Sequence, residues 1–317
     1  MRKLLQASLS AIALALFACS ATAQNAAAPY PNQIVKIIVP FSAGSLTDLL
    51  ARVLSDKLGA LWKQSVIVEN HPGIAGTALA AKAPADGYTL MVTSNGHTVI
   101  KLTNPNIPVD PVKDFVGVTK LASMPLIMIA PPTANHDTLQ KLVALMHSKS
   151  GSASYASAGL ASTAYIAGEL FKKTENLDIL HIPYKGTPDA QTSIMRGDTD
   201  FFFSPASVSD DLIHIGKVKA LAVTGAKRVQ SLPDVPTFKE AGMPEFEYDA
   251  WFGLMAPANT PQDVLDKISK DVDAVMAAPD VREWLAKQGT TVVTSTPAQF
   301  TETVRKDTET FTAMLKK

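Results

Sequence analysis

Pro40-Phe41-Ser42-Ala43-Gly44-Ser45-Leu46-Thr47-Asp48 joins an apolar strand to an amphipathic helix through a loop of small residues. The strand is predicted over Ile34–Val39, because this β-branched run is too short for a helix. The helix is predicted over Leu46–Leu58, where leucine and valine recur at helical spacing. The loop therefore lies at a helix N-terminus, where free N–H groups and the helix dipole favour a carboxylate or a phosphate.

A second loop of the same kind follows later in the chain. Ser157–Thr163 comes after a strand predicted at Ala153–Ala156 and opens a helix predicted over Ser162–Lys173. Two such loops facing each other would suit a ligand with anionic groups, although serine, threonine and aspartate at helix starts are often only caps. Asp48 would repel an anion, so we expect it to point away and to fix its loop by accepting N–H bonds.

Other candidates lie where further predicted strands end. Ser94 and His97 follow a strand at Tyr88–Val92, and Tyr184 follows one at Ile179–Ile182. Phe203 ends a strand at Thr199–Phe203, and Ser204 follows it. Phe201-Phe202-Phe203 reads as core, with Phe203 the residue expected to reach a ligand. The expected ligand-binding residues are Phe41, Ser42, Ala43, Gly44, Ser45, Thr47, Asp48, Ser94, His97, Ser157, Ala158, Gly159, Thr163, Tyr184, Phe203 and Ser204.

Short β-branched runs alternate with helical patterns almost throughout, which predicts an α/β fold with parallel sheets. Leu126–Ala130 and Tyr248–Leu254 are apolar extended segments that flank the middle of the chain, and we interpret them as two crossing strands. This predicts two lobes with a ligand cleft between them. Residues 24–125 and 250–317 would form a discontinuous first lobe, and 126–249 the second.

The first 23 residues read as a secretory signal peptide. Arg2 and Lys3 precede an apolar run from Leu4 to Ala18, and Ala21-Thr22-Ala23 fits the small-residue cleavage pattern. Cleavage near Ala23 would export the mature protein to the periplasm without a thiol, because Cys19 is the single cysteine of the chain. Lipidation of Cys19 is the competing interpretation.

Composition and motif spacing exclude several classes of protein. Removal of the signal leaves 27 basic and 29 acidic residues, a net charge of about −2, which argues against nucleic acid as a partner. The dinucleotide, phosphate-loop and serine-hydrolase motifs are absent, and the six histidines form no metal pair. We therefore expect no catalytic residues, no metal and no cofactor, with a secreted enzyme of unfamiliar design as the alternative.

Ordered motifs along the mature chain resemble the periplasmic solute receptors of tripartite tricarboxylate transporters, the Bug family. The segments that carry the resemblance are Ile38–Gly44 with Asp48, Asn70-His71-Pro72-Gly73, Ala85–Leu90, Asp110–Phe115, Tyr155–Gly159, Gly168–Phe171, His181–Gly186, Leu232–Thr237 and Trp251–Leu254.

The resemblance implies a type II periplasmic-binding-protein fold that closes on a small carboxylate. It implies delivery to the large and small integral membrane subunits of a permease by a receptor that we expect to be a monomer; delivery to a sensor protein is an alternative. Ser42–Asp48 and Ser157–Gly159 would grip the carboxylate. The chain departs from the family at Ser45, which replaces a glycine and narrows the loop, and at Ser204-Pro205, which replaces an Asp-Asn pair. Loss of the acidic residue of that pair favours an aromatic or di/tricarboxylic ligand.

Overall fold

A computed structural model describes residues 30–160 and 162–315 of the chain. The predicted signal peptide, its cleavage site and Cys19 lie outside the described residues. The chain first forms the expected alternation of strand and helix: β1 (Val35–Val39), α2 (Leu46–Trp62), β2 (Val66–Asn70), α3 (Ile74–Ala81) and β3 (Thr89–Ser94). A 3₁₀ turn, η2 (Asn95–Val99), and the short helix α4 (Ile100–Thr103) follow directly.

The middle of the chain continues the alternation. Its elements are β4 (Phe115–Ala130), α5 (Leu139–Ser148), β5 (Ser154–Ser157), α6 (Thr163–Thr174), β6 (Leu180–Pro183), α7 (Thr187–Arg196), β7 (Phe201–Pro205), α8 (Ala206–His214) and β8 (Lys219–Val223). Strand β4 is much longer than the predicted Leu126–Ala130, because its first half also pairs with other strands.

The last segment returns to the beginning of the fold. It contains β9 (Asp249–Pro257), α9 (Gln262–Met276), α10 (Pro279–Lys287), β10 (Thr291–Val292) and α11 (Pro297–Leu315). The sequence did not predict α10, because Val281 and Leu285 are the buried residues of that helix and two positions give a weak periodic signal.

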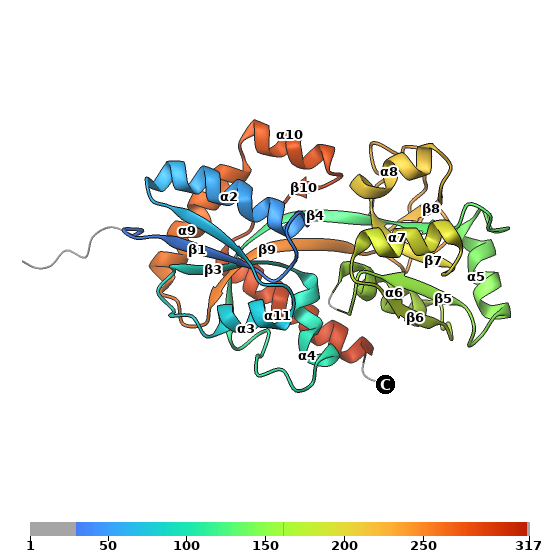
Figure 1. Cartoon of the computed structure of the whole chain (residues 1–317), viewed down its shortest axis with the longest axis horizontal. Coiled ribbons are helices and arrows are strands. Elements are labelled where there is room, and N and C mark those ends of the chain that lie inside the picture. Colours follow the sequence, from blue (N-terminus) through green and yellow to red (C-terminus); the bar gives the residue numbers. More distant parts are fainter. Residues whose placement is uncertain (1–29, 161, 316–317) are drawn as a thin grey trace, which may run out of the picture. The chain divides into compact units, whose positions relative to one another are not determined.

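The strands form a mixed sheet with the order β2-β1-β3-β9-β4-β7-β5-β6, and β8 and β10 also pair with β4. Strands β1, β2 and β3 are mutually parallel, as are β5, β6 and β7, which confirms the parallel units predicted from the alternation. Strands β4 and β9 are antiparallel to their neighbours, because the chain crosses from one set to the other and back. Figure 1 shows these two long strands side by side through the sheet.

These two parallel sets define the two lobes of the fold. The first lobe holds β1–β3, and the second holds β5–β8. The lobe boundaries predicted at 125/126 and 249/250 lie within β4 and β9, the strands that connect the lobes.

Each lobe has its own apolar core. In the first, Phe300 of α11 packs against β9 and meets the Trp251 ring edge-on at 5.1 Å. A side chain on Gly253 would bring its Cβ within 2.0 Å of the Phe300 ring, so close packing of α11 requires glycine there. The second core is aromatic and is built from Phe171, Phe201, Phe203, Phe238 and Phe246.

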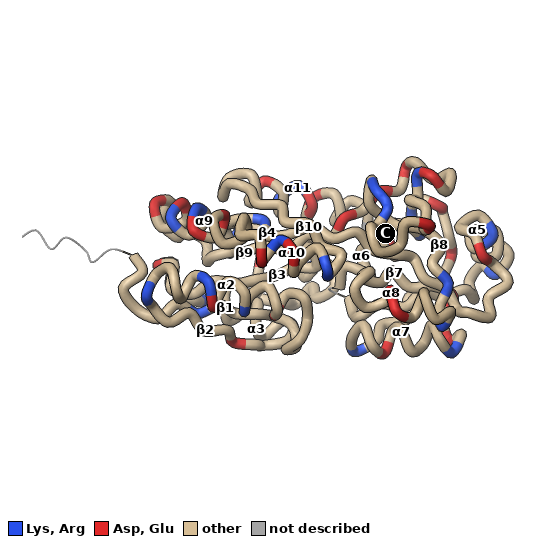
Figure 2. The backbone as a smooth tube through the Cα atoms, turned by 90° about the horizontal axis from the view of Figure 1, so that it is seen from above, with Lys and Arg blue, Asp and Glu red and all other residues tan. Residues whose placement is uncertain are grey.

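Charged residues of both signs are interspersed over the described part of the chain (Figure 2). On α11, for example, Arg305 pairs with Glu302 and Glu309. The figure displays no long stretch of one sign over the described residues.

Candidate ligand-binding site

The register of the sheet places the carboxyl ends of the two parallel sets opposite each other along β4. Ser94, at the end of β3, pairs with Phe252, which in turn pairs with Ala122 of β4. Pro205, at the end of β7, pairs with Leu126 of β4. Strands β3 and β4 run in the same direction, and β7 runs in the opposite one, so these two ends point toward each other. They are four positions apart on β4, roughly 13 Å at the usual rise of a strand.

The N-termini of several helices lie at these ends of the strands. Helices α2 and α3 follow β1 and β2, while α6, α7 and α8 follow β5, β6 and β7. Ligands of open α/β sheets bind outside the carboxyl ends of the strands, where the helix N-termini present N–H groups and a partial positive charge. The region between the two sets is therefore the candidate site.

Asp48 holds the first loop, Phe41–Ser45, in place. Its carboxylate accepts hydrogen bonds from the Gly44 N–H at 2.8 Å, from Arg52 Nε at 3.1 Å and from Asn70 Nδ2 at 3.0 Å. Asn70 also donates to the Phe41 carbonyl at 3.2 Å. The start of the loop is therefore held by the Asn70 amide, and Gly44 near its end is held by the Asp48 carboxylate. Burial opposes ionisation of Asp48, but the hydrogen bonds from Arg52, Gly44 and Asn70 outweigh it and lower the pKa of Asp48. These contacts match the structural role expected for Asp48.

The first turn of α2 keeps N–H groups that can bind an anion. Ser45 is the N-cap, and its Oγ accepts from the Asp48 N–H at 3.2 Å. Within residues 30–160 and 162–315, no acceptor bonds the N–H groups of Leu46 and Thr47. Ser42, Ala43 and Gly44 are exposed, Phe41 and Ser45 are half-buried, and Thr47 is buried. The backbone of the loop is thus exposed to solvent, while the Ser45 hydroxyl caps helix α2.

Ser94 and His97 are buried beneath the end of β3. His97 Nε2 donates to the Pro111 carbonyl at 2.9 Å, and the ring meets Phe115 edge-on at 4.9 Å. Burial lowers the pKa of His97 to about 4, so the ring is neutral near pH 7. This structure gives His97 a packing role and no surface for a ligand, contrary to the expectation from its polar loop.

The serine side chains at the two ends of the second loop, Ser157–Ser162, are bonded to protein groups. Ser157 is fully buried, and its Oγ lies 2.7 Å from His181 Nε2, 3.1 Å from the Gly159 nitrogen and 3.2 Å from the Gly159 carbonyl oxygen. Ser162 caps α6 by accepting from the Tyr165 N–H at 3.2 Å. Ala158, Gly159 and Thr163 are half-buried. The Ser157 hydroxyl, expected to contact ligand, is engaged by protein groups.

The remaining candidates separate into surface and core. Tyr184 is half-buried, its N–H donates to the Ser157 carbonyl at 2.9 Å, and its side chain lines a polar hollow beside α7. Phe203 is fully buried and stacks on Phe238 and Phe246, so the expectation that it reaches a ligand is not met in this structure. Ser204 is also fully buried, and its Oγ accepts from Ser209 Oγ at 2.6 Å.

Sequence reasoning missed residues that act through tertiary contacts. Asn70 and Arg52 fix Asp48, and His181 contacts Ser157. Asn95 donates to the Tyr248 hydroxyl at 2.6 Å, which links η2 to the segment entering β9. Asn70 and His181 lie in family-like segments of the sequence, but the sequence alone gave them no partner.

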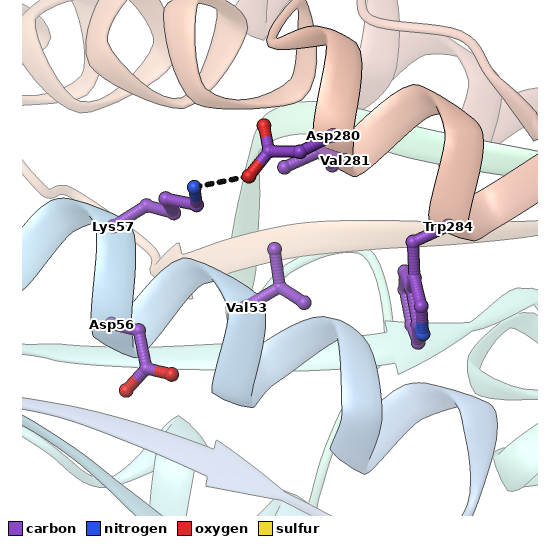
Figure 3. Close-up of a pocket in the computed structure, with 6 residues that line it drawn as sticks. All are labelled: Val53, Asp56, Lys57, Asp280, Val281 and Trp284. Carbon is purple, nitrogen blue, oxygen red and sulfur yellow. Dashed lines mark hydrogen bonds and ion pairs between the residues drawn. The ribbon is translucent and has the colours of Figure 1, made fainter.

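A shallow pocket elsewhere on the first lobe lies between α2 and α10 (Figure 3). It is lined by Val53, Asp56, Lys57, Asp280, Val281 and Trp284, and the Lys57–Asp280 ion pair of 2.5 Å crosses it. None of the predicted ligand-binding residues lines this pocket.

The residues that the structure describes contain no cluster of three or more histidine, cysteine or acidic side chains arranged to hold a metal ion. Within the same residues, the helices are too short or too polar for a membrane crossing.

Comparison with known proteins identifies relatives along nearly the whole chain. The family model described as "Tripartite tricarboxylate transporter family receptor" matches residues 50–317. The chain is 33% identical to protein BugT of Bordetella pertussis over 298 residues, which cover 92% of this chain and 91% of BugT.

Two solved structures of Rhodopseudomonas palustris proteins are similar to this one. Rpa4515, determined with adipate, is 27% identical with a TM-score of 0.80, and the match covers 90% of this chain and 97% of Rpa4515. MatC, determined with bound malate, is 28% identical with a TM-score of 0.79, and the match covers 90% of this chain and 100% of MatC.

Proposed function

Because this chain belongs to the tripartite tricarboxylate transporter receptor family, whose members are solute-binding proteins and not enzymes, we propose that it captures a small dicarboxylate between its two lobes. The ligand lies between the first loop, Phe41–Ser45, and the second loop, Ser157–Ser162. The protein acts in the periplasm after cleavage of its signal peptide near Ala23.

The observation that carries this proposal is the pair of opposed strand ends, each followed by a helix N-terminus. At the first loop, the N–H groups of Leu46 and Thr47 have no acceptor within the described residues. The charge of Asp48 is paired with Arg52, and its carboxylate also accepts a hydrogen bond from Asn70. A carboxylate placed there accepts N–H bonds and gains from the helix dipole, by about 0.3–1 kcal/mol per helix for the dipole term.

A dicarboxylate is favoured over a monocarboxylate because the second lobe offers the N-termini of α6, α7 and α8 at the opposite strand ends. The relatives determined with adipate and malate support the same class of ligand. Aromatic acids are included in the same screen, because the chain has Ser204-Pro205 where the family has an acidic residue.

Binding is proposed to close the lobes about β4 and β9. Contacts from both lobes to one ligand exist together only in the closed form, so the ligand shifts the equilibrium toward closure. The closed receptor then delivers the ligand to the membrane subunits of the transporter.

The test is a thermal-shift screen of residues 24–317 against adipate, malate, citrate and benzoate, with sodium chloride as the ionic control. A ligand at 100 times its Kd stabilises the native state by about 2.7 kcal/mol, or roughly 5–10 °C for a chain of this size. Mass spectrometry should recover the ligand unchanged. Failure of every carboxylate to shift the melting temperature beyond the chloride control would refute the proposed ligand class.

A further inference from the structure

We propose that His181 is a positioning residue, which holds the Ser157 hydroxyl and through it the second loop, so that this loop meets the ligand with its backbone and not with the Ser157 side chain. The proposal deepens the proposed function and rests on it where ligand affinity is concerned. The local contacts that carry it are independent of any ligand.

The pairing of β5 with β6 brings the two side chains together. Tyr155 of β5 pairs with His181 of β6, and Ser157 lies two residues beyond Tyr155 on the same face of the sheet. The Ser157 Oγ and His181 Nε2 are 2.7 Å apart, which is a short hydrogen bond for these atoms.

The bonding capacity of the Ser157 hydroxyl is used by the protein. A hydroxyl has one proton to donate and two lone pairs to accept with. The Gly159 carbonyl already accepts from the Ser162 hydroxyl at 2.7 Å and from the Ser162 N–H at 3.1 Å. The Ser157 proton is therefore directed to His181 Nε2, while its oxygen accepts the Gly159 N–H at 3.1 Å.

The His181 ring itself packs against two tyrosines. Its centroid lies 4.9 Å from that of Tyr155, on which it stacks, and 4.8 Å from that of Tyr165 of α6, which is tilted against it. The Tyr155 hydroxyl donates to Glu169 Oε1 at 2.7 Å, which fixes the tyrosine to α6 as well. Burial lowers the pKa of His181 to about 4, so its Nε2 is free to accept a proton-donating partner at neutral pH.

Through Ser157, His181 stabilises an unusual backbone turn at Gly159. Gly159 has a φ of +107°, outside the range that other residues readily adopt, and its N–H is bound by Ser157. Loss of the bond from the Gly159 N–H to Ser157 would make this turn, which directly precedes α6, more mobile. We therefore expect changes at His181 to affect binding without any direct contact between His181 and the ligand.

Two substitutions at one position test this role. His181→Gln keeps a polar group near the place of Nε2, whereas His181→Leu removes it, and both lose the aromatic stacking. His181→Leu should weaken adipate binding by roughly 2- to 12-fold, the worth of one hydrogen bond, while His181→Gln stays within about 2-fold of the wild type. His214→Gln, on the exposed surface of α8, is the matched control.

A double-mutant cycle separates positioning from general destabilisation. Ser157→Ala should weaken binding as much as His181→Leu, and the double variant should be no weaker than either, because both remove the same bond. Additive losses would overturn the proposal, as would a His181→Leu variant that binds adipate like the wild type.

Measurements on the ligand-free protein test the positioning role of His181 separately from the proposed carboxylate binding. Hydrogen exchange of the Gly159 amide should be faster in His181→Leu and Ser157→Ala than in the wild type, but not in His181→Gln. The ¹⁵N resonance of His181 Nε2 should move in Ser157→Ala. Unchanged exchange and an unmoved resonance would refute the positioning role, even if no carboxylate is found to bind.

Discussion

Replacement of Asp48 by alanine should destabilise the protein strongly, because this carboxylate is 1% exposed and binds three donors. The substitution removes the acceptor of the Gly44 N–H at 2.8 Å, of Asn70 Nδ2 at 3.0 Å and of Arg52 Nε at 3.1 Å. It leaves the first loop without the contact that ties it to α2 and β2.

The magnitude follows from the exposure of the three partners. The Arg52 side chain is 52% exposed, so its ion pair contributes less than about 1 kcal/mol. Each of the other two bonds goes to a charged acceptor in a partly buried position and contributes about 1.5 kcal/mol. The total is about 3–4 kcal/mol, which corresponds to a fall of roughly 6–16 °C in melting temperature.

Thermal and urea unfolding at pH 7 measure this loss, with Asp56→Ala as the matched control. Asp56 lies on the same helix and is exposed. Its replacement should therefore change the free energy of unfolding by no more than about 0.5 kcal/mol. Asp48→Asn, which can still accept one bond, should fall between the control and Asp48→Ala. A melting temperature of Asp48→Ala equal to that of Asp56→Ala would refute the reasoning.

The contribution of Asp48 should also depend on pH in one direction. Its folded pKa lies below the ordinary value of 3.8, so the ionised form stabilises the native state above that pH. This stability is lost as the pH falls below 3.8 through the lowered folded pKa. The difference between wild type and Asp48→Ala should therefore shrink in acid.

Gly168→Ala should cost about 1–3 kcal/mol in urea unfolding, because the new Cβ would lie 2.1 Å from the Tyr155 ring; Gly59→Ala, with nothing nearer than 3.4 Å, should be neutral or stabilising. Phe203→Ala should cost about 3–5 kcal/mol, and a smaller loss would contradict its place in the aromatic core. The lowered pKa of His97, about 4, means that this ring alone removes about 3 kcal/mol of stability as the pH drops from 6.5 to 4. Unfolding of His97→Gln at several pH values should lack this component, and an identical pH slope would argue against a buried neutral ring.

The sequence by itself determined the α/β class, the alternation of strands and helices through the first and middle parts of the chain, and the loops that open α2 and α6. These features depend on local patterns: β-branched runs, helical periodicity and small residues at a strand end. The role of Asp48 was also predicted, because a carboxylate beside an anion site must be neutralised or turned away. The lengths of β4 and β9 were underestimated, because the whole of β9 and the first part of β4 are defined by their pairing with each other.

Tertiary structure alone decided which polar side chains are free. Ser45, Ser157 and Ser204 looked alike in sequence, but one caps a helix, one binds His181 and one binds Ser209. His97 follows the end of β3 and Phe203 lies near the end of β7, where a ligand was expected, yet packing buries both side chains. Hydrogen-bond partners and burial depend on residues far away in the sequence, such as Asn70 for Asp48 and His181 for Ser157. The local sequence pattern around a residue does not predict such distant partners.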